Sequence, residues 1–272
     1  VTYTDPGRDS RDSMPIGNGE LGANVWVEPN GDLCCYLART DAWSENCRLL
    51  KLGRLRVSID PAPDTNEGFE QTLSPQEGIV RVEMGEGDSR AEIEVYADAG
   101  ADDLRIHADT ATPTEIAVEL ERWRRAARTI PVDDGDSLEI RSAYGLQDAP
   151  APVVVTPDAV LDDDDHVVWY HRNAGSTYPR NLRLQGLDPS RDAFDDPLLR
   201  QTIGGAISGP NLVRADDATL ASGTPSDSHR VSVCTHAART EQVGEWLDVV
   251  DRRTASAAAT DPERARSRTV GR

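Results

Sequence analysis

The chain has 272 residues, which is long enough for one large β domain or two small domains. Its formal net charge of −19 argues against nucleic acid and anionic membranes as partners. Most acidic residues are Asp, and every basic residue except Lys51 is Arg. This composition favours a source that lives in concentrated salt, where a Debye length of roughly 3 Å screens self-repulsion. A GC-rich genome is the alternative, but it explains only the excess of Arg.

Two glycine-flanked polar residues open the first patterned stretch. Residues 17–22 contain three glycines, with Asn18 and Glu20 between them. One interpretation is a bend or bulge that leads into a strand. The other is a backbone that lets a ligand approach, with Asn18 and Glu20 facing it.

The clearest hairpin of the sequence is centred on Asn30-Gly31. This pair is favoured in a type I′ turn, because both central residues of that turn need positive φ. A two-residue loop would place Val27 opposite Cys34 and Trp26 opposite Cys35. Both faces of the ribbon are largely apolar, so we expect it to be covered on both sides.

A polar segment with a tryptophan follows the hairpin. Residues 40–46 have poor periodicity, so we place them on a loop. Trp43 lies there between Asp41 and Glu45. An aromatic ring between carboxylates is typical of a sugar site, where the ring stacks on the pyranose and the acids bind hydroxyls. The alternative is that Trp43 closes the end of a sandwich and the acids are solvated.

Short alternating segments then recur at close intervals, separated by Gly, Asp or Pro. They cover residues 54–59, 79–84, 91–96, 104–108 and 115–120. Such a series predicts a sandwich or a barrel. Two charged runs interrupt it: a basic island at 122–128, expected on a solvated loop or against a partner domain, and four aspartates at 162–165. The aspartates lack the spacing and turn glycine of a calcium loop, so we expect a solvated acidic loop.

A further strand, residues 167–173, ends in His171, Arg172 and Asn173. These side chains are suited to recognising hydroxyls or a carboxylate, and equally to capping neighbouring carbonyls. Residues 203–209 and 229–235 are expected as strands too, the first closely packed or bent because it is rich in glycine.

The pattern becomes helical after Glu241. Val243, Trp246, Leu247 and Val250 recur at helical spacing, which predicts an amphipathic helix. Residues 252–272 have little to bury, so we expect a linker or a frayed end there.

The sequence contains no motif for a cofactor or a metal. The four cysteines fit neither a zinc site nor a disulfide framework, and we expect them to be buried small hydrophobes. The glycine segments lack the spacing of dinucleotide and phosphate loops. No apolar run has transmembrane length and no signal peptide is in view, so we expect a soluble protein.

Together these segments resemble the amino-terminal domain of the uncharacterised family called domain of unknown function 5703. That family is similar to the first domain of the family 95 glycoside hydrolases, the α-L-fucosidase type. The residues that carry the resemblance are 13–22 (SMPIGNGELG), 40–43 (TDAW), 48–57 (RLLKLGRLRV), 170–173 (YHRN) and 204–209.

The resemblance implies an all-β fold, a large antiparallel β-sandwich (supersandwich) over residues 1–240. A short helix and a linker-like tail over 241–272 would then lead to an (α/α)₆ helical barrel, which this chain does not contain. In the fucosidase-type relatives the acid and base carboxylates lie in that barrel, while sandwich loops edge the pocket. The resemblance therefore implies carbohydrate binding here without a catalytic residue. The candidates for binding are Asn18, Glu20, Asp41, Trp43, His171, Arg172 and Asn173.

Three functions are compatible with the sequence. We favour a carbohydrate-facing accessory domain of a glycoside-hydrolase-like protein, with the helical barrel as a partner in cis or in trans. A second is an active glycosidase, with the barrel supplied or with local carboxylates such as Glu20, Asp41 and Glu45. A third is a structural sandwich whose helix after Glu241 docks on another domain through an exposed apolar stripe.

Overall fold

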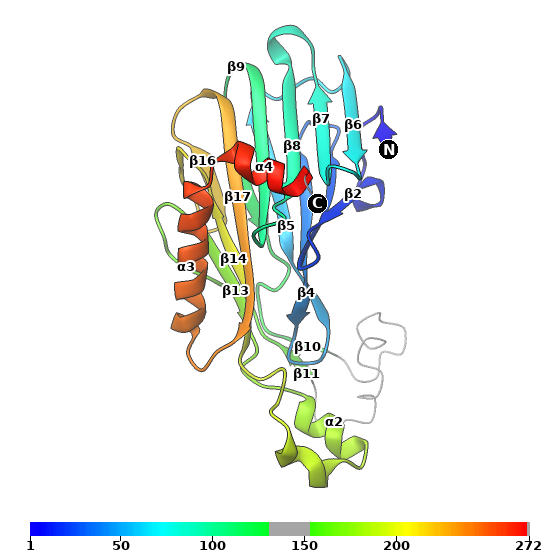
Figure 1. Ribbon diagram of the computed structural model, residues 1–272, viewed down its shortest axis with the longest axis vertical. Coiled ribbons are helices and arrows are strands. Elements are labelled where there is room, and N and C mark those ends of the chain that lie inside the picture. The colour runs from blue at the N-terminus through cyan, green and yellow to red at the C-terminus, as the bar shows by residue number, and fades with distance from the viewer. Residues whose placement is uncertain (131–152, 271–272) are drawn as a thin grey trace.

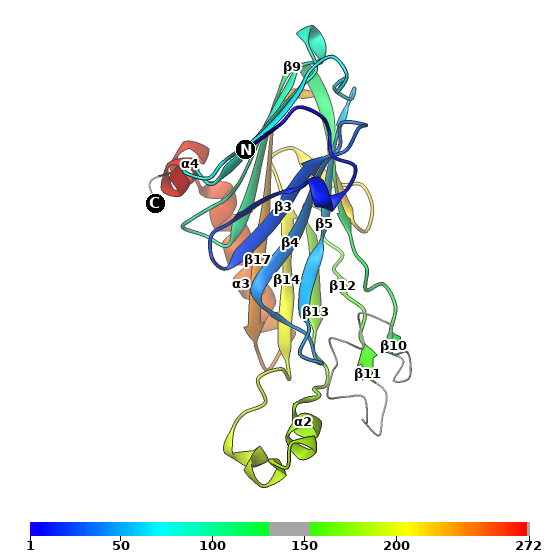
Figure 2. The ribbon, with the colours of Figure 1, turned by 90° about the vertical axis from the view of Figure 1, so that its right-hand side faces the viewer.

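The structure is a computed structural model that describes residues 1–130 and 153–270. Two antiparallel sheets pack face to face, and helices cover one of them (Figures 1 and 2). The predicted all-β antiparallel sandwich is thus confirmed. None of the helices in the described ranges is both long and apolar enough to span a bilayer.

The first sheet, sheet A, has the order β1-β6-β7-β8-β9-β17-β14-β13-β12. Its strands are β1 (Thr2–Tyr3), β6 (Phe69–Ser74), β7 (Ile79–Met84), β8 (Ala91–Ala97), β9 (Asp103–Glu121), β12 (Ala159–Val160), β13 (Val167–Arg172), β14 (Gln201–Ser208) and β17 (Ser226–Arg239).

The second sheet, sheet B, has the order β2-β3-β4-β5-β9-β16-β15. Its strands are β2 (Met14–Gly17), β3 (Leu21–Val27), β4 (Leu33–Trp43), β5 (Leu49–Asp60), β9, β15 (Leu212–Arg214) and β16 (Thr219–Ser222). A separate ribbon consists of β10 (Arg128–Ile130) and β11 (Val153–Val155). The helices are α2 (Tyr178–Leu184), α3 (Val243–Ala259) and α4 (Pro262–Val270), and short 3₁₀ turns cover Ser10–Asp12, Gly87–Ser89 and Asp188–Ala193.

Strand β9 belongs to both sheets. Its first half pairs with β8 and β17, and its second half pairs with β5 and β16. The sequence predicted two strands here, 104–108 and 115–120, where the structure has one continuous strand of 19 residues. The chain changes sheets near Pro113, which has no N–H to contribute to a ladder. The alternating apolar residues of both sheets meet in one core.

The hairpin register differs from the prediction by one residue. Val27 lies opposite Leu33 and Trp26 opposite Cys34. The loop has three residues, because the Gly31 N–H donates to the Glu28 carbonyl at 2.9 Å and Gly31 has a φ of 89°. This is a type I turn followed by a left-handed glycine, which accommodates Asn-Gly as readily as the shorter turn does. Because of this shift, Leu33 and Cys35 lie on the same face as Val25 and Val27, and all four side chains point into the core.

Helix α3 forms where the periodicity predicted a helix, and it packs on the outer face of sheet A. Trp246 and Val250 are fully buried against Val168 and Ala206. The apolar stripe is therefore covered by this chain's own sheet. The exposed stripe that the structural-docking hypothesis required was a wrong prediction.

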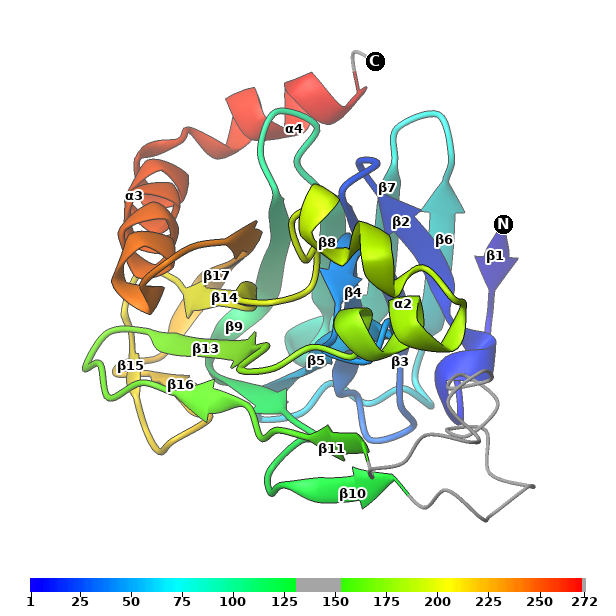
Figure 3. The same cartoon turned by 90° about the horizontal axis from the view of Figure 1, so that it is seen from below.

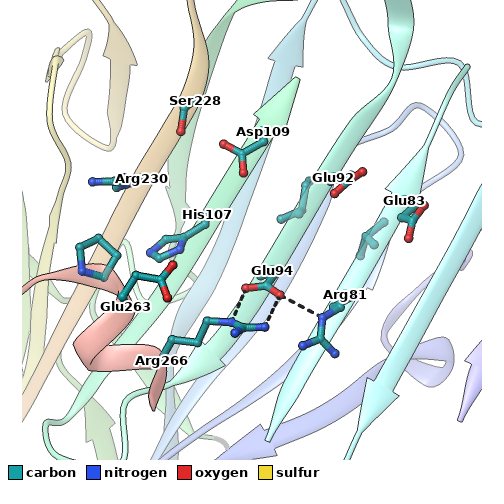
Figure 4. A pocket seen from close by; sticks show the side chains of 13 residues that line it. Arg81, Glu83, Glu92, Glu94, His107, Asp109, Ser228, Arg230, Glu263 and Arg266 are labelled. Carbon is teal, nitrogen blue, oxygen red and sulfur yellow. Dashed lines mark hydrogen bonds and ion pairs between the residues drawn. The ribbon is translucent and has the colours of Figure 1, made fainter. Parts of the chain in front are cut away.

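The expectation of a linker or frayed end from residue 252 was wrong: residues 252–259 continue helix α3 and residues 262–270 form helix α4, while 271–272 lie outside the described residues. Ala265 packs between Ile79 and Tyr96, and the other anchors are ion pairs. Arg268 lies 2.6 Å from Asp98, and Arg266 lies 3.0 Å from Glu94 (Figure 4). The hydrophobic periodicity did not predict this helix, because the segment has few apolar residues and charged side chains make most of its contacts.

The other expectations for single segments are met in part. Cys34, Cys35 and Cys234 are buried, but Cys47 is exposed, with a φ of 60°. Residues 162–165 lie on the loop before β13 and are largely exposed. Residues 131–152, between the basic island and the four aspartates, are rich in Asp and Pro and lie outside the described residues.

Salt should stabilise this protein. We expect the thermal midpoint to rise by several degrees between low salt and molar potassium chloride, because a net charge of −19 opposes the compact state and a Debye length of about 3 Å screens that repulsion. Differential scanning calorimetry measures the midpoint, and choline chloride should act like potassium chloride. A midpoint that is independent of salt would contradict the expectation.

Candidate functional site

The C-terminal half of β4 carries two of the seven predicted site residues, Asp41 and Trp43. The register of β4 with β5 jumps between Ala38, which lies opposite Lys51, and Trp43, which lies opposite Leu49. Residues 39–42 thus form an irregular insertion. They belong to the strand and not to the predicted loop, and the loop proper begins at Ser44. Arg39 continues the core-facing alternation of Leu33, Cys35 and Leu37, so its side chain points toward sheet A where the insertion begins.

Arg39 is the centre of the first cluster. Its side chain is buried, and its Nε and Nη2 donate to the two carboxylate oxygens of Asp41 at 2.9 and 3.0 Å. Its Nη1 lies 3.2 Å from Asp102 and donates to the Thr235 hydroxyl at 3.1 Å. Glu20 lies 3.8 Å from Nη2. The structure therefore brings together two predicted residues, Glu20 and Asp41, through an arginine that the sequence analysis missed.

Asp102 links this cluster to helix α3. Its carboxylate accepts a hydrogen bond from Arg253 at 2.6 Å. Burial alone would raise the pKa of Asp102, but the guanidinium groups of Arg253 and Arg39 outweigh burial and hold the pKa below its ordinary value. The cluster thus presents partly exposed carboxylates whose positions are fixed by the buried guanidinium of Arg39 and the partly exposed one of Arg253.

His171 is the centre of the second cluster. The side chain is buried, with Nε2 at 2.9 Å from Glu45 and Nδ1 at 3.2 Å from Asp158. Asp158 also pairs with Arg124 at 2.6 Å, and Glu45 accepts from the Thr156 N–H at 3.3 Å. These contacts tie the loop after β4 to the segment before β12. A sugar could reach His171 only after this cluster had opened.

The pKa values in the His171 cluster move in opposite directions. Burial alone would lower the pKa of His171, but hydrogen bonds to Asp158 and Glu45 raise it above the ordinary 6.5. Burial alone would raise the pKa of Glu45, but His171 brings it below the ordinary 4.5. Both shifts favour an imidazolium clamped by carboxylates.

We expect this cluster to stabilise the fold most between pH 4.5 and 6.5. The contribution of His171 is complete below its ordinary pKa and is lost as the pH rises through the raised, folded value. The contribution of Glu45 is complete above its ordinary pKa and is lost as the pH falls through the lowered value. Urea unfolding of the wild type and of His171→Gln across pH measures the difference in unfolding free energy. A difference that does not change with pH would refute this assignment.

The remaining predicted residues hold backbone in place. Asn18 donates to the carbonyls of Asp98 and Ala101 at 2.9 and 2.8 Å, and its own oxygen accepts from two N–H groups of the next turn. Asn173 is fully buried and donates to the carbonyls of Trp43 and Leu198 at 3.0 and 2.9 Å.

Arg172 reaches the connection between β17 and α3, where it donates to the carbonyls of Thr240 and Glu241. Of the two roles that the sequence left open for these strand-end residues, capping of carbonyls is the one that Arg172 and Asn173 perform in this structure.

Exposure singles out Trp43 among the predicted residues. Its ring is 44 % exposed. The side chains of Asp41 and Glu20 are 39 % and 58 % exposed. Asp41 and Trp43 lie at the end of β4, which in Figures 1 and 3 comes near α2 and the ribbon of β10 and β11, and Glu20 lies in the turn between β2 and β3.

A separate polar cavity of about 360 Å³ lies on the outer face of sheet A beside α4 (Figure 4). Glu94 lies there between Arg81 and Arg266, at 2.9 Å and 3.0 Å. Its charged groups serve to dock α4. Within residues 1–130 and 153–270, no group of three or more His, Cys, Asp or Glu side chains is arranged to hold a metal ion.

Fold and site together define a large antiparallel β-sandwich domain with an accessible tryptophan and carboxylates at one end. The chain belongs to the family described as Domain of unknown function (DUF5703), whose N-terminal profile matches residues 2–271. No curated protein sequence matches it.

Among solved structures, the chain is similar to a protein provisionally assigned as a kojibiose phosphorylase from the human microbiome. The sequence identity is 7 % and the TM-score 0.48, and the match covers 99 % of this chain and 37 % of that protein. The chain therefore spans little more than a third of that protein's length.

Proposed function

We propose that this chain is the carbohydrate-facing N-terminal β-sandwich of a glycoside-hydrolase-like protein. It binds sugar and does not hydrolyse it alone, and a helical barrel in cis or in trans is its partner. The half-exposed side chain of Trp43 carries the proposal, because it offers a pyranose a stacking surface, with the accessible carboxylate of Asp41 two residues before it on β4.

Only part of the predicted residue set enters this proposed site. Trp43 provides the stacking face, and Asp41 and Glu20 accept hydrogen bonds from sugar hydroxyls. Arg39 holds Asp41 in place from below. Asn18, Arg172 and Asn173 contribute indirectly, through the backbone that they fix.

Exposed apolar residues support the proposal that a partner domain docks on this chain. Leu184 and Leu187 in and after α2 are each 46 % exposed, and Phe194 is 70 % exposed. All three belong to the segment beyond the end of the sheets in Figure 1, on the side where Trp43 lies. A domain docked there would complete a pocket around Trp43.

Binding of neutral sugars should depend on Trp43. We expect intrinsic fluorescence titrations in high salt to show weak, saturable binding of a neutral mono- or oligosaccharide. Trp43→Ala should weaken it about fivefold or more, since stacking of one ring is worth about 1 kcal/mol or more. Val213→Ala is the control, because Val213 is 49 % exposed on β15, which β5, β9 and β16 separate from β4 in sheet B. Equal loss in both variants, or no response to any sugar, would count against the proposed site.

A further inference from the structure

The basic island of the sequence forms an aromatic and cationic surface on a strongly acidic protein. We call it the Trp123 patch and define it as Tyr36, Lys51, Arg122, Trp123 and Arg125. Trp123 is 51 % exposed, although its ring packs edge-on against Tyr36 at 5.6 Å. The ammonium of Lys51 lies 3.9 Å from the centre of the Tyr36 ring.

The patch is held rigidly from beneath. Arg124 donates to the Lys51 carbonyl at 3.0 Å and pairs with the buried Asp158 at 2.6 Å. The Asp158 N–H in turn donates to the Arg124 carbonyl at 2.8 Å. These bonds fix the chain directly after Trp123, so its exposed ring needs little ordering when a ligand binds.

Among residues 1–130 and 153–270, no carboxylate neutralises the cations of the patch. Nearby Glu121 is engaged by Arg54 and by Arg56, the latter at 2.8 Å, and Asp158 is engaged by Arg124 and His171. Lys51, Arg122 and Arg125 form no ion pair with any of the residues that the structure describes. The Nε of Arg122 is buried without a hydrogen-bond partner among them.

From this arrangement we propose that the Trp123 patch is a second carbohydrate site, selective for anionic sugars. A pyranose ring stacks on the exposed face of Trp123. Its carboxylate or sulfate pairs with Lys51, Arg122 and Arg125, which stand out against a net charge of −19. A neutral sugar gains only the stacking.

The patch and Trp43 share one side of sheet B. Trp43 lies opposite Leu49 on β5, and Lys51 follows two residues later, so the pleat directs all three side chains the same way. Leu49 is 53 % exposed between them. The two tryptophans are nevertheless separate sites, and the Trp123 patch does not depend on the proposed role of Trp43.

Calorimetry with a charged and an uncharged form of one ligand tests this. The probes are an α-1,4-linked oligogalacturonate, its fully methyl-esterified form, and a sulfated oligosaccharide. We expect at least one anionic probe to bind at least tenfold more tightly than the neutral ester, and its affinity to fall as salt is raised. Which anionic probe binds tells whether the patch takes uronates or sulfates.

Two variants of the patch test whether the anionic probe binds there. Trp123→Ala should weaken binding of the anionic probe at least tenfold. The exposed pair Lys51→Gln and Arg125→Gln, which leaves the fold intact, should bring the anionic probe to the affinity of the neutral ester. Trp43→Ala should leave it unchanged. Equal affinity for charged and neutral forms, no binding of any anionic probe, or binding that survives both patch variants would overturn the proposal.

Discussion

Replacing Asp158 with Ala should destabilise the fold by about 3–5 kcal/mol, because it leaves the buried guanidinium of Arg124 without its carboxylate and the buried imidazolium of His171 with Glu45 alone. The Asp158 side chain is 1 % exposed and contacts both Arg124 and His171. Urea unfolding at pH 6 measures the free energy. The variant should also loosen the Trp123 patch, since Arg124 anchors it.

Asp162→Ala is the matched control for this prediction. Asp162 lies four residues further along the chain but is fully solvated, so its loss should change stability by less than about 0.5 kcal/mol. A loss below about 1 kcal/mol for Asp158→Ala would mean that the cluster is not an ion-pair clamp.

Trp246→Ala is the second change with a large expected effect, about 3–5 kcal/mol. The Trp246 ring is fully buried, stacks on His236 at 6.1 Å and packs against Tyr170 at 5.7 Å. Its Nε1 donates to the His236 carbonyl at 3.3 Å. Truncation would leave a cavity between α3 and sheet A that the rigid strands beneath cannot close.

The same unfolding measurement tests this variant, with Leu247→Ala as the control on the same helix. Leu247 is only partly buried, so its truncation should be less costly. If Trp246→Ala were no worse than Leu247→Ala, α3 would be a loosely attached helix. The hypothesis that its stripe docks on a partner would then regain support.

Alternation predicted the sandwich well, because period two is imposed by burial on one face of each strand. Strand β7 begins and ends at the predicted residues, and β13 ends one residue early. The hairpin register failed because Asn30-Gly31 suits two loop lengths, and only tertiary contacts select between them. One residue of slip exchanges the faces of every side chain.

The site was harder to predict, since its clusters join residues distant in sequence. Arg39 carried a signal: it continues the buried positions Leu33, Cys35 and Leu37 of β4, so a buried charge could have been inferred. Asp158 gave no comparable sign, because its partner His171 lies on another strand and its partner Arg124 on another loop. Trp43 was recognisable from composition, but its exposure was not.

The dual membership of β9 has a consequence for the order of folding. Ile106 pairs with Val231, and Val118 pairs with Leu220, so each half of β9 lacks one neighbour until the chain beyond residue 220 is available. Until then a 19-residue strand presents an open edge in both sheets. Such distant pairing slows folding and leaves a long-lived species prone to edge-to-edge association. Neither sheet can then be completed ahead of the other. We expect both sheets to form late in refolding, in one cooperative step.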